Sequence, residues 1–137
     1  DVEVVTVADH KTGMSASLRL GAQAAEAAAA YALMVLPADM PALAAYLAGI
    51  WQAYRELRAG QILRATTSQG QAGHPVIFPS DVFSGFQSLT GDTGAAPILQ
   101  HFEPLVHLHP LPHAIARHDL NTPEDWSAWR QNGVAEE

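Results

Sequence analysis

Short apolar runs alternate along the chain with longer stretches in which apolar residues recur at helical spacing. The short runs are rich in β-branched residues and end at turn-forming residues, a pattern typical of strands. They cover Val2–Val7, Tyr31–Leu36, Gln61–Thr67, His74–Pro79 and Leu105–Leu108. Helices are expected over Leu18–Ala30, Ala42–Ala59, Ser80–Leu89, Ala95–His101 and Thr122–Trp129. This alternation predicts an α/β domain with a mainly parallel sheet, whose ligands bind at the carboxyl ends of the strands.

Two of the predicted helices have clear end signals. The stretch Ala42–Ala59 is followed by Gly60, a residue that commonly ends helices. Near the carboxyl terminus, Thr122 is a natural N-cap and Pro123 fits the first helical position. We therefore expect one long helix in the middle of the chain and a shorter one close to its end.

Length and composition favour a single domain. The 137 residues are 48% hydrophobic, which is enough to build one continuous core, so we expect one domain over residues 1–137. The absence of cysteine excludes disulfides and favours a reducing, cytoplasmic location. The longest apolar run, 22–37, contains Gln23 and Glu26 and is too short to span a bilayer.

The chain is acidic, with a formal net charge of -7 and Lys11 as its one lysine. Such a chain repels a phosphate backbone, which argues against nucleic acid as a partner. Any nucleotide that it handles is expected to be small and bridged by a metal ion.

Asp39 is the first candidate for chemistry. It directly follows an apolar strand and lies in a turn between Pro37 and Pro41. Magnesium prefers carboxylate oxygens together with substrate phosphates, so an aspartate fixed at a strand end suits a metal–nucleotide site. The alternative is that Asp39 caps the helix that begins after it, and the local sequence leaves both interpretations open.

Two glycine-containing segments are weaker candidates. Gly13, Ser15 and Ser17 lie at a predicted helix start, where backbone N–H groups can face an anion. The small residues of 70–73 permit close approach of a ligand, and His74 adds a hydrogen-bonding group. Ordinary turns and caps explain both segments equally simply.

The histidines near the carboxyl end raise a further alternative. His107 and His109 alternate along one predicted strand, and His113 follows. Zinc accepts such ligands, but the chain has no cysteine and the spacing matches no closed structural zinc site. We therefore favour solvent-exposed histidines over a transition-metal site.

Five segments, taken in order, resemble motifs of the molybdenum cofactor nucleotidyltransferases. The segment 13–19, GMSASLR, is similar to the family's G-x-S-x-S-L motif, and 36–41, LPADMP, resembles L-x-D-x-P. The segment 73–78, GHPVIF, resembles G-H-P-V-x-F, and 91–95, GDTGA, resembles G-D-x-G-A-R. The last, 119–125, DLNTPED, is close to D-I-D/N-T-P-E-D. Together the five are spread over residues 13–125, which is nearly the whole length of the chain.

The resemblance implies a three-layer α/β/α Rossmann-like fold and an activity. The enzyme would transfer CMP or GMP from CTP or GTP to the phosphate of molybdopterin, releasing pyrophosphate. Asp39 would hold Mg²⁺, with Asp119 or Asn121 as the second residue of the metal site. A molybdenum hydroxylase or its accessory protein is the partner that the family suggests. The substrate-binding candidates are Gly13, Ser15, Ser17, Gly73, His74, Pro75, Gly91, Asp92 and Gly94, the last three bordering the pterin.

The chain departs from the family pattern in two places. The family begins with a glycine-rich loop and a phosphate-binding lysine that do not occur here, so we expect the chain to be the carboxyl-terminal two-thirds of the domain and to be inactive alone. Ala96 stands where the family has arginine, which removes a charge able to contact phosphate. A non-catalytic binding module and a sugar-phosphate nucleotidyltransferase of the same fold are the two alternatives.

Overall fold

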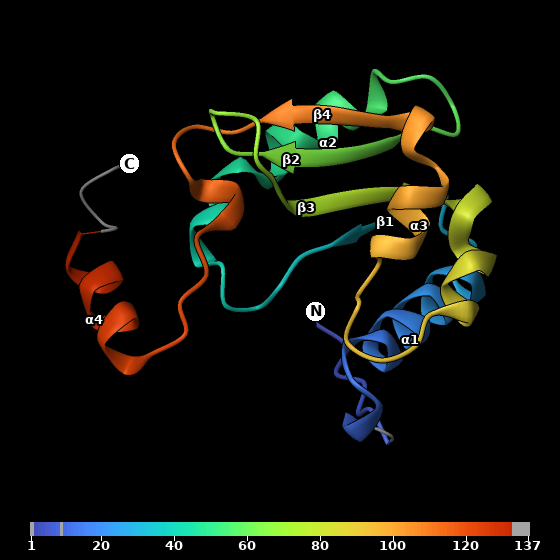
Figure 1. Cartoon of the computed structure of the whole chain (residues 1–137), viewed down its shortest axis with the longest axis horizontal. Coiled ribbons are helices and arrows are strands. Elements are labelled where there is room, and N and C mark those ends of the chain that lie inside the picture. The colour runs from blue at the N-terminus through green and yellow to red at the C-terminus, as the bar shows by residue number, and fades with distance from the viewer. Residues whose placement is uncertain (1, 9, 133–137) are drawn as a thin grey trace. The chain divides into compact units, whose positions relative to one another are not determined.

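The computed structural model describes residues 2–8 and 10–132 and contains both helices and strands (Figure 1). The α-helices are α1 Met14–Ala27, α2 Leu47–Arg55, α3 Ala96–His101 and α4 Pro123–Asn132. The strands are β1 Ala32–Val35, β2 Ile62–Thr66, β3 Ala72–Pro79 and β4 Val106–Pro110. Short 3₁₀ helices are η1 His10–Thr12, η2 Pro41–Tyr46, η3 Ser80–Ser88, η4 Glu103–Leu105 and η5 Ile115–Arg117. The α/β class predicted from the sequence is confirmed.

The strands form one mixed sheet in the order β1-β3-β2-β4. Strands β2 and β3 are antiparallel, with Leu63 opposite Ile77 and Arg64 opposite Val76. Gly70, at φ 86°, lies in the turn between them, and its N–H donates to the Thr67 carbonyl oxygen at 2.9 Å. So tight a connection cannot carry the crossover that parallel neighbours need, which is why this part of the sheet is antiparallel.

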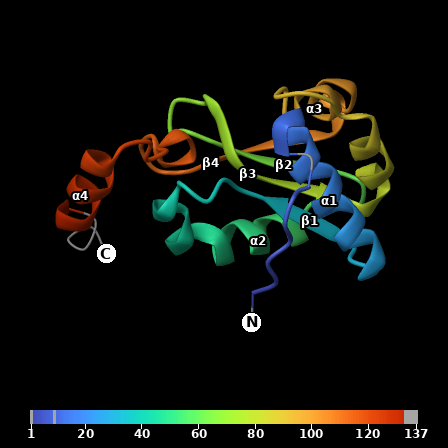
Figure 2. The same cartoon turned by 90° about the horizontal axis from the view of Figure 1, so that it is seen from below.

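The chain divides into two compact units, and the first comprises residues 1–33, 59–62 and 78–106. In this unit α1 packs against η3, and both Figure 1 and Figure 2 show them side by side. The alanines of α1 allow close packing, with Ala16 and Ala22 buried. Phe78 and Phe86 meet edge to face with ring centroids 5.1 Å apart, the favourable geometry for two aromatic rings. This packing holds the start of α1.

The second unit comprises residues 34–58, 63–77 and 107–137. Its core contains Leu43 of η2, Ile50 of α2, and Leu63 and Ile77 of the hairpin, all buried. Figure 2 shows α2 along one side of the hairpin strands. Here η2 packs against η5, and this contact places the loop before η2 beside the segment that follows η5.

The strand predicted over Val2–Val7 is wrong, because these residues adopt no regular secondary structure. A β-branched run forms a strand only where a neighbouring strand accepts its hydrogen bonds, and none of the described residues supplies one. Val2 and Val4 therefore stay 90% and 85% exposed.

The other elements agree with the predictions apart from their ends. The helix predicted over Ala42–Ala59 divides into η2 and α2, and Pro41 opens the 3₁₀ part. The predicted cap of the last helix is confirmed, since Thr122 Oγ1 accepts the Asp125 N–H at 3.1 Å. None of the described helices combines the length and the apolar character needed to cross a membrane.

Candidate functional site

Asp39 lies in the loop between β1 and η2, as the two prolines around it predict. Its Oδ1 atom is buried and has no hydrogen-bond partner within the described part of the chain. The N-cap position of η2 belongs to Met40, so the structure does not support the capping role for Asp39. A buried carboxylate oxygen without a donor costs free energy unless a cation or another donor satisfies it. A metal ion is one group that would satisfy this oxygen.

His74 lies on β3 and is half-buried. Burial lowers its pKa most, the positive charge of Arg64 lowers it further, and the negative charge of Asp39 acts in the opposite direction. The imidazole is therefore neutral at pH 7, with one nitrogen donating and the other accepting. The peptide bond between His74 and Pro75 is cis. The electrostatic effect of Asp39 on His74 places these two predicted site residues in one neighbourhood.

Two arginines that the sequence analysis did not select join this neighbourhood. Arg64 of β2 has a buried Nε atom without a hydrogen-bond partner in the part of the chain that the structure describes. Burial, and then the charge of Arg117, lower the pKa of Arg64. Arg117, at the end of η5, donates from Nη1 to the Ala72 carbonyl oxygen at 3.3 Å. A charged residue within the mostly apolar strand β2 was the signal that could have identified Arg64.

The segment around Asp119 lies next to the Asp39 loop. The Leu120 N–H donates to the Asp39 carbonyl oxygen at 2.8 Å, which ties the two segments together. The Asp119 side chain is exposed, and its Oδ2 accepts a hydrogen bond from Asn121 Nδ2 at 3.1 Å. The side chains of Asp119 and Asn121 thus lie together next to the Asp39 loop, and either one stays a candidate for the second residue of the metal site.

Gly73 and Pro75, on either side of His74, are buried. A Cβ atom added to Gly73 would overlap the backbone carbonyl of Ala116 in η5. The glycine therefore lets β3 and η5 approach closely, and this packing is a structural reason for glycine at the position. The contact also holds Arg117 beside β3.

The remaining predicted site residues come together in the first unit. The Met14 N–H donates to Asp92 Oδ1 at 3.0 Å, and the Ser15 N–H donates to the Gly91 carbonyl oxygen at 3.1 Å. Asp92 is far from α1 in the sequence, but its carboxylate lies at the N-terminus of this helix, where a negative charge is stabilising. Gly13, at φ 91°, leaves no room for a Cβ beside Gly91 and Asp92. The N–H groups of Met14 and Ser15 are therefore already hydrogen-bonded within the protein.

The side chains of this second cluster differ in exposure. Ser15 is fully buried and its Oγ has no hydrogen-bond partner among the described residues, whereas Ser17 is exposed. Gly94 is buried at φ 60°, and an added Cβ would lie 3.3 Å from the Met14 sulfur. A role in substrate binding stays a prediction for all of these residues.

A groove of about 590 Å³ lies in the second unit between η2, the η5 region and α4, and Leu120, which is hydrogen-bonded to Asp39, is among its lining residues. None of the predicted site residues lines it. The lining residues are Pro41, Ala42, Ala44, Ala45, Tyr46, Ile115, His118, Leu120, Asp125, Ala128, Trp129 and Asn132.

The donors around Asp39 suit a metal ion that is shared with a substrate. Among residues 2–8 and 10–132, no three His, Cys, Asp or Glu side chains gather closely enough to hold a metal ion by themselves. Magnesium characteristically binds through one or two carboxylates plus substrate phosphates and waters. One orphaned carboxylate oxygen in a polar neighbourhood fits this mode and not a closed protein cage.

Comparison with solved structures supports the fold. Rv0371c from Mycobacterium tuberculosis, crystallised with manganese, is 24% identical with a TM-score of 0.63, over 82% of this chain and 57% of that one. A second structure of Rv0371c is 23% identical with a TM-score of 0.64, over 85% and 59%. A homologue from a Mycobacterium species, strain JC1, is 20% identical with a TM-score of 0.59, over 79% and 52%. The chain thus spans little more than half the length of these proteins.

A comparison with curated proteins gave no match. The family model described as the MobA-like NTP transferase domain matches residues 1–109, which include the Asp39 loop, the β2–β3 hairpin and the 91–94 turn. The chain therefore belongs to the family of MobA-like NTP transferase domains.

Proposed function

We propose that this chain is part of a nucleotidyltransferase that transfers CMP or GMP from CTP or GTP to the terminal phosphate of molybdopterin or the molybdenum cofactor, releasing pyrophosphate. The observation that carries the proposal is the buried Asp39 Oδ1 in the loop after β1, which has no hydrogen-bond partner among the described residues, in the neighbourhood of His74. Family membership supports an NTP as the substrate. The five motifs described above support molybdopterin as the acceptor. We expect the reaction to take place in the cytoplasm and its product to be passed to a molybdenum hydroxylase or its accessory protein.

Asp39 would hold Mg²⁺ together with nucleotide phosphates, and Asp119 or Asn121 would lie next to it. Rv0371c was crystallised in complex with manganese, which is consistent with a divalent ion in this fold. A bound divalent ion would neutralise charge on the phosphates and align the displacement at the α-phosphorus.

The chain's own residues contribute by positioning. The loop of Asp39 is fixed between β1 and η2 and is tied to Leu120, so the carboxylate is presented with little freedom. Neutral His74 can donate one hydrogen bond to a phosphate oxygen without adding a charge. No side-chain nucleophile is needed, because the acceptor phosphate attacks and pyrophosphate leaves. Orientation and electrostatics then account for most of the rate.

The test is pyrophosphate release by the full-length protein with Mg²⁺ and molybdenum-loaded molybdopterin, comparing CTP with GTP. Asp39→Asn removes the charge and keeps the shape, and should lower the rate by about 100-fold or more. Asp81→Asn, an exposed aspartate of the first unit, is the matched control and should leave it unchanged. A folded protein that releases pyrophosphate with neither nucleotide would refute the transferase and favour a binding module.

A further inference from the structure

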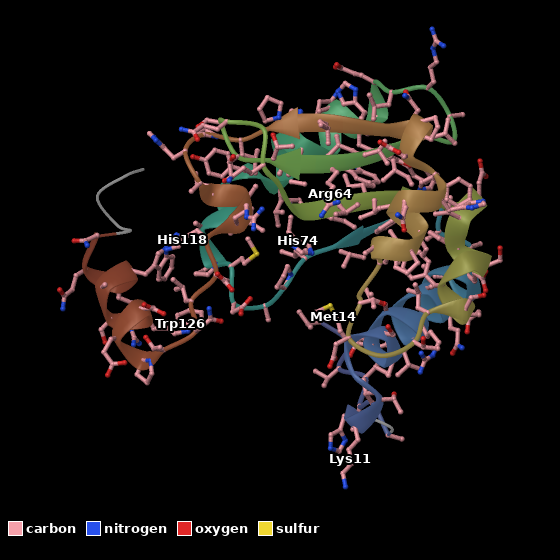
Figure 3. The ribbon with its side chains drawn as sticks, viewed as in Figure 1. Lys11, Met14, Arg64, His74, His118 and Trp126 are labelled. Atoms are coloured by element: carbon pink, nitrogen blue, oxygen red, sulfur yellow. The ribbon has the colours of Figure 1, made fainter. Side chains whose placement is uncertain are left out.

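Arg64 and His74 lie near one another on the β2–β3 hairpin. Arg64 pairs with Val76, and the register of the two strands shifts between this pair and the next, Thr66 with Ala72. His74 lies within the irregular stretch of β3, and the positive charge of Arg64 lowers the pKa of its imidazole. Figure 3 shows the two labelled side chains near one another, one from each strand. Because the charges of both Arg64 and Asp39 act on the same imidazole, His74 lies between these two residues in the electrostatic network.

Arg117 adds a second positive charge at this place. Its hydrogen bond to the Ala72 carbonyl oxygen fixes it at the beginning of β3, and its charge acts on Arg64. The close fit of Gly73 against Ala116 keeps η5 in this position. The positive charges of the two guanidinium groups repel each other, and an anion beside them would relieve this repulsion.

The hydrogen bonds point to the same conclusion. The buried Arg64 Nε has no acceptor among the described residues, although a guanidinium offers five donors in a planar fork. Burying a charged donor without an acceptor is costly, so an acceptor from outside the protein would recover that free energy. Phosphate matches the fork geometry and can be bound through two parallel hydrogen bonds.

We propose that Arg64 and Arg117 form a binding site for a phosphate group, adjacent to Asp39 and His74. Nothing in the resemblance or in the comparisons assigns this role to either arginine. The inference rests on the proposed function in that the phosphate belongs to one of the two substrates, either the nucleotide or the phosphate monoester of the acceptor. These two sources share the same chemistry, and the site lies beside the carboxylate that would hold the metal.

Phosphate binding can be measured without catalysis, through the Arg64 Nε–Hε resonance in ¹H–¹⁵N NMR spectra of the full-length protein. Titration with inorganic phosphate should shift this resonance. Arg64→Gln should weaken phosphate binding by roughly 10- to 100-fold, the range expected for losing a charge-assisted pair. Arg117→Gln should weaken phosphate binding as well, and because this side chain is exposed the variant should fold normally. Arg55→Gln, at the exposed end of α2, is the control and should have no effect.

A competition experiment separates the two sources. If CTP displaces glycerol 3-phosphate from the site, the phosphate belongs to the nucleotide; if both bind together, it belongs to the acceptor, and either result supports the site. An unshifted Arg64 resonance, or unchanged phosphate binding in both arginine variants, overturns the inference. Phosphate binding that persists in a protein without pyrophosphate release would refute the proposed transferase and keep the anion site.

Discussion

Replacing Gly73 with alanine tests the structural reason for a glycine next to His74. The added Cβ would overlap the Ala116 carbonyl oxygen, and would lie 2.6 Å from the carbonyl carbon and 2.9 Å from the Ala116 Cβ. These neighbours are largely backbone, so η5 has to move away from β3. Overpacking of this kind typically costs about 1–3 kcal/mol. For a domain of this size, that loss lowers Tm by roughly 3–9 °C.

Thermal unfolding followed by circular dichroism measures the effect, and Gly49→Ala is the matched control. Gly49 lies within α2 with nothing near its added Cβ, so alanine there should stabilise the protein by about 0.5–1 kcal/mol through helix propensity. Opposite signs for the two variants are expected. If Gly73→Ala leaves Tm unchanged but reduces activity, the glycine serves ligand approach and the packing explanation is incorrect.

The remaining predictions concern single side chains. Ser15→Ala removes a buried hydroxyl that has no hydrogen-bond partner among the described residues, so thermal unfolding should show an unchanged or raised Tm, and a lowered Tm would contradict this. Ser17→Ala, at an exposed side chain, should leave Tm unchanged. NMR titration of metal-free protein should give His74 a pKa below about 6.5, raised by Arg64→Gln. Because unfolded chains then bind more protons, stability should rise with pH from the folded pKa to about 6.5. The pKa of Asp125 is lowered mostly by its hydrogen bond with the Thr122 side chain and then by the hydrogen bonds that it accepts from backbone N–H groups. The ionised Asp125 should therefore stabilise the start of α4 fully above about pH 4, and this stabilisation should be lost as the pH falls through the lower pKa of the folded protein. Helix α4 signals that show no change in this acid range would disprove the last point.

The sequence predicted the parts of the fold that depend on local patterns. The strands at 31–36 and 61–67 and the cap at Thr122 appear where expected, because apolar runs and capping chemistry act over a few residues. The strand predicted over Val2–Val7 was wrong because a strand depends on a partner strand elsewhere in the fold, which its own residues cannot indicate.

The candidate site shows the same division. Asp39 and His74 were identified from turns and motifs, but their electrostatic coupling arises from the fold. Arg64 and Arg117 were missed, since only the hairpin register and the position of η5 bring their charges together. The hydrogen bond from the Met14 N–H to the Asp92 carboxylate likewise joins residues far apart in the sequence, and no local pattern predicts it.

The central claim is that Asp39 holds a divalent ion shared with the nucleotide beside His74. The most direct measurement is paramagnetic broadening of the His74 ring resonances when Mn²⁺ and CTP or GTP are added to the full-length protein. We expect broadening of the His74 resonances that requires both metal and nucleotide and that disappears in Asp39→Asn but not in Asp81→Asn. Equal broadening in Asp39→Asn, or broadening confined to residues far from His74, would contradict it.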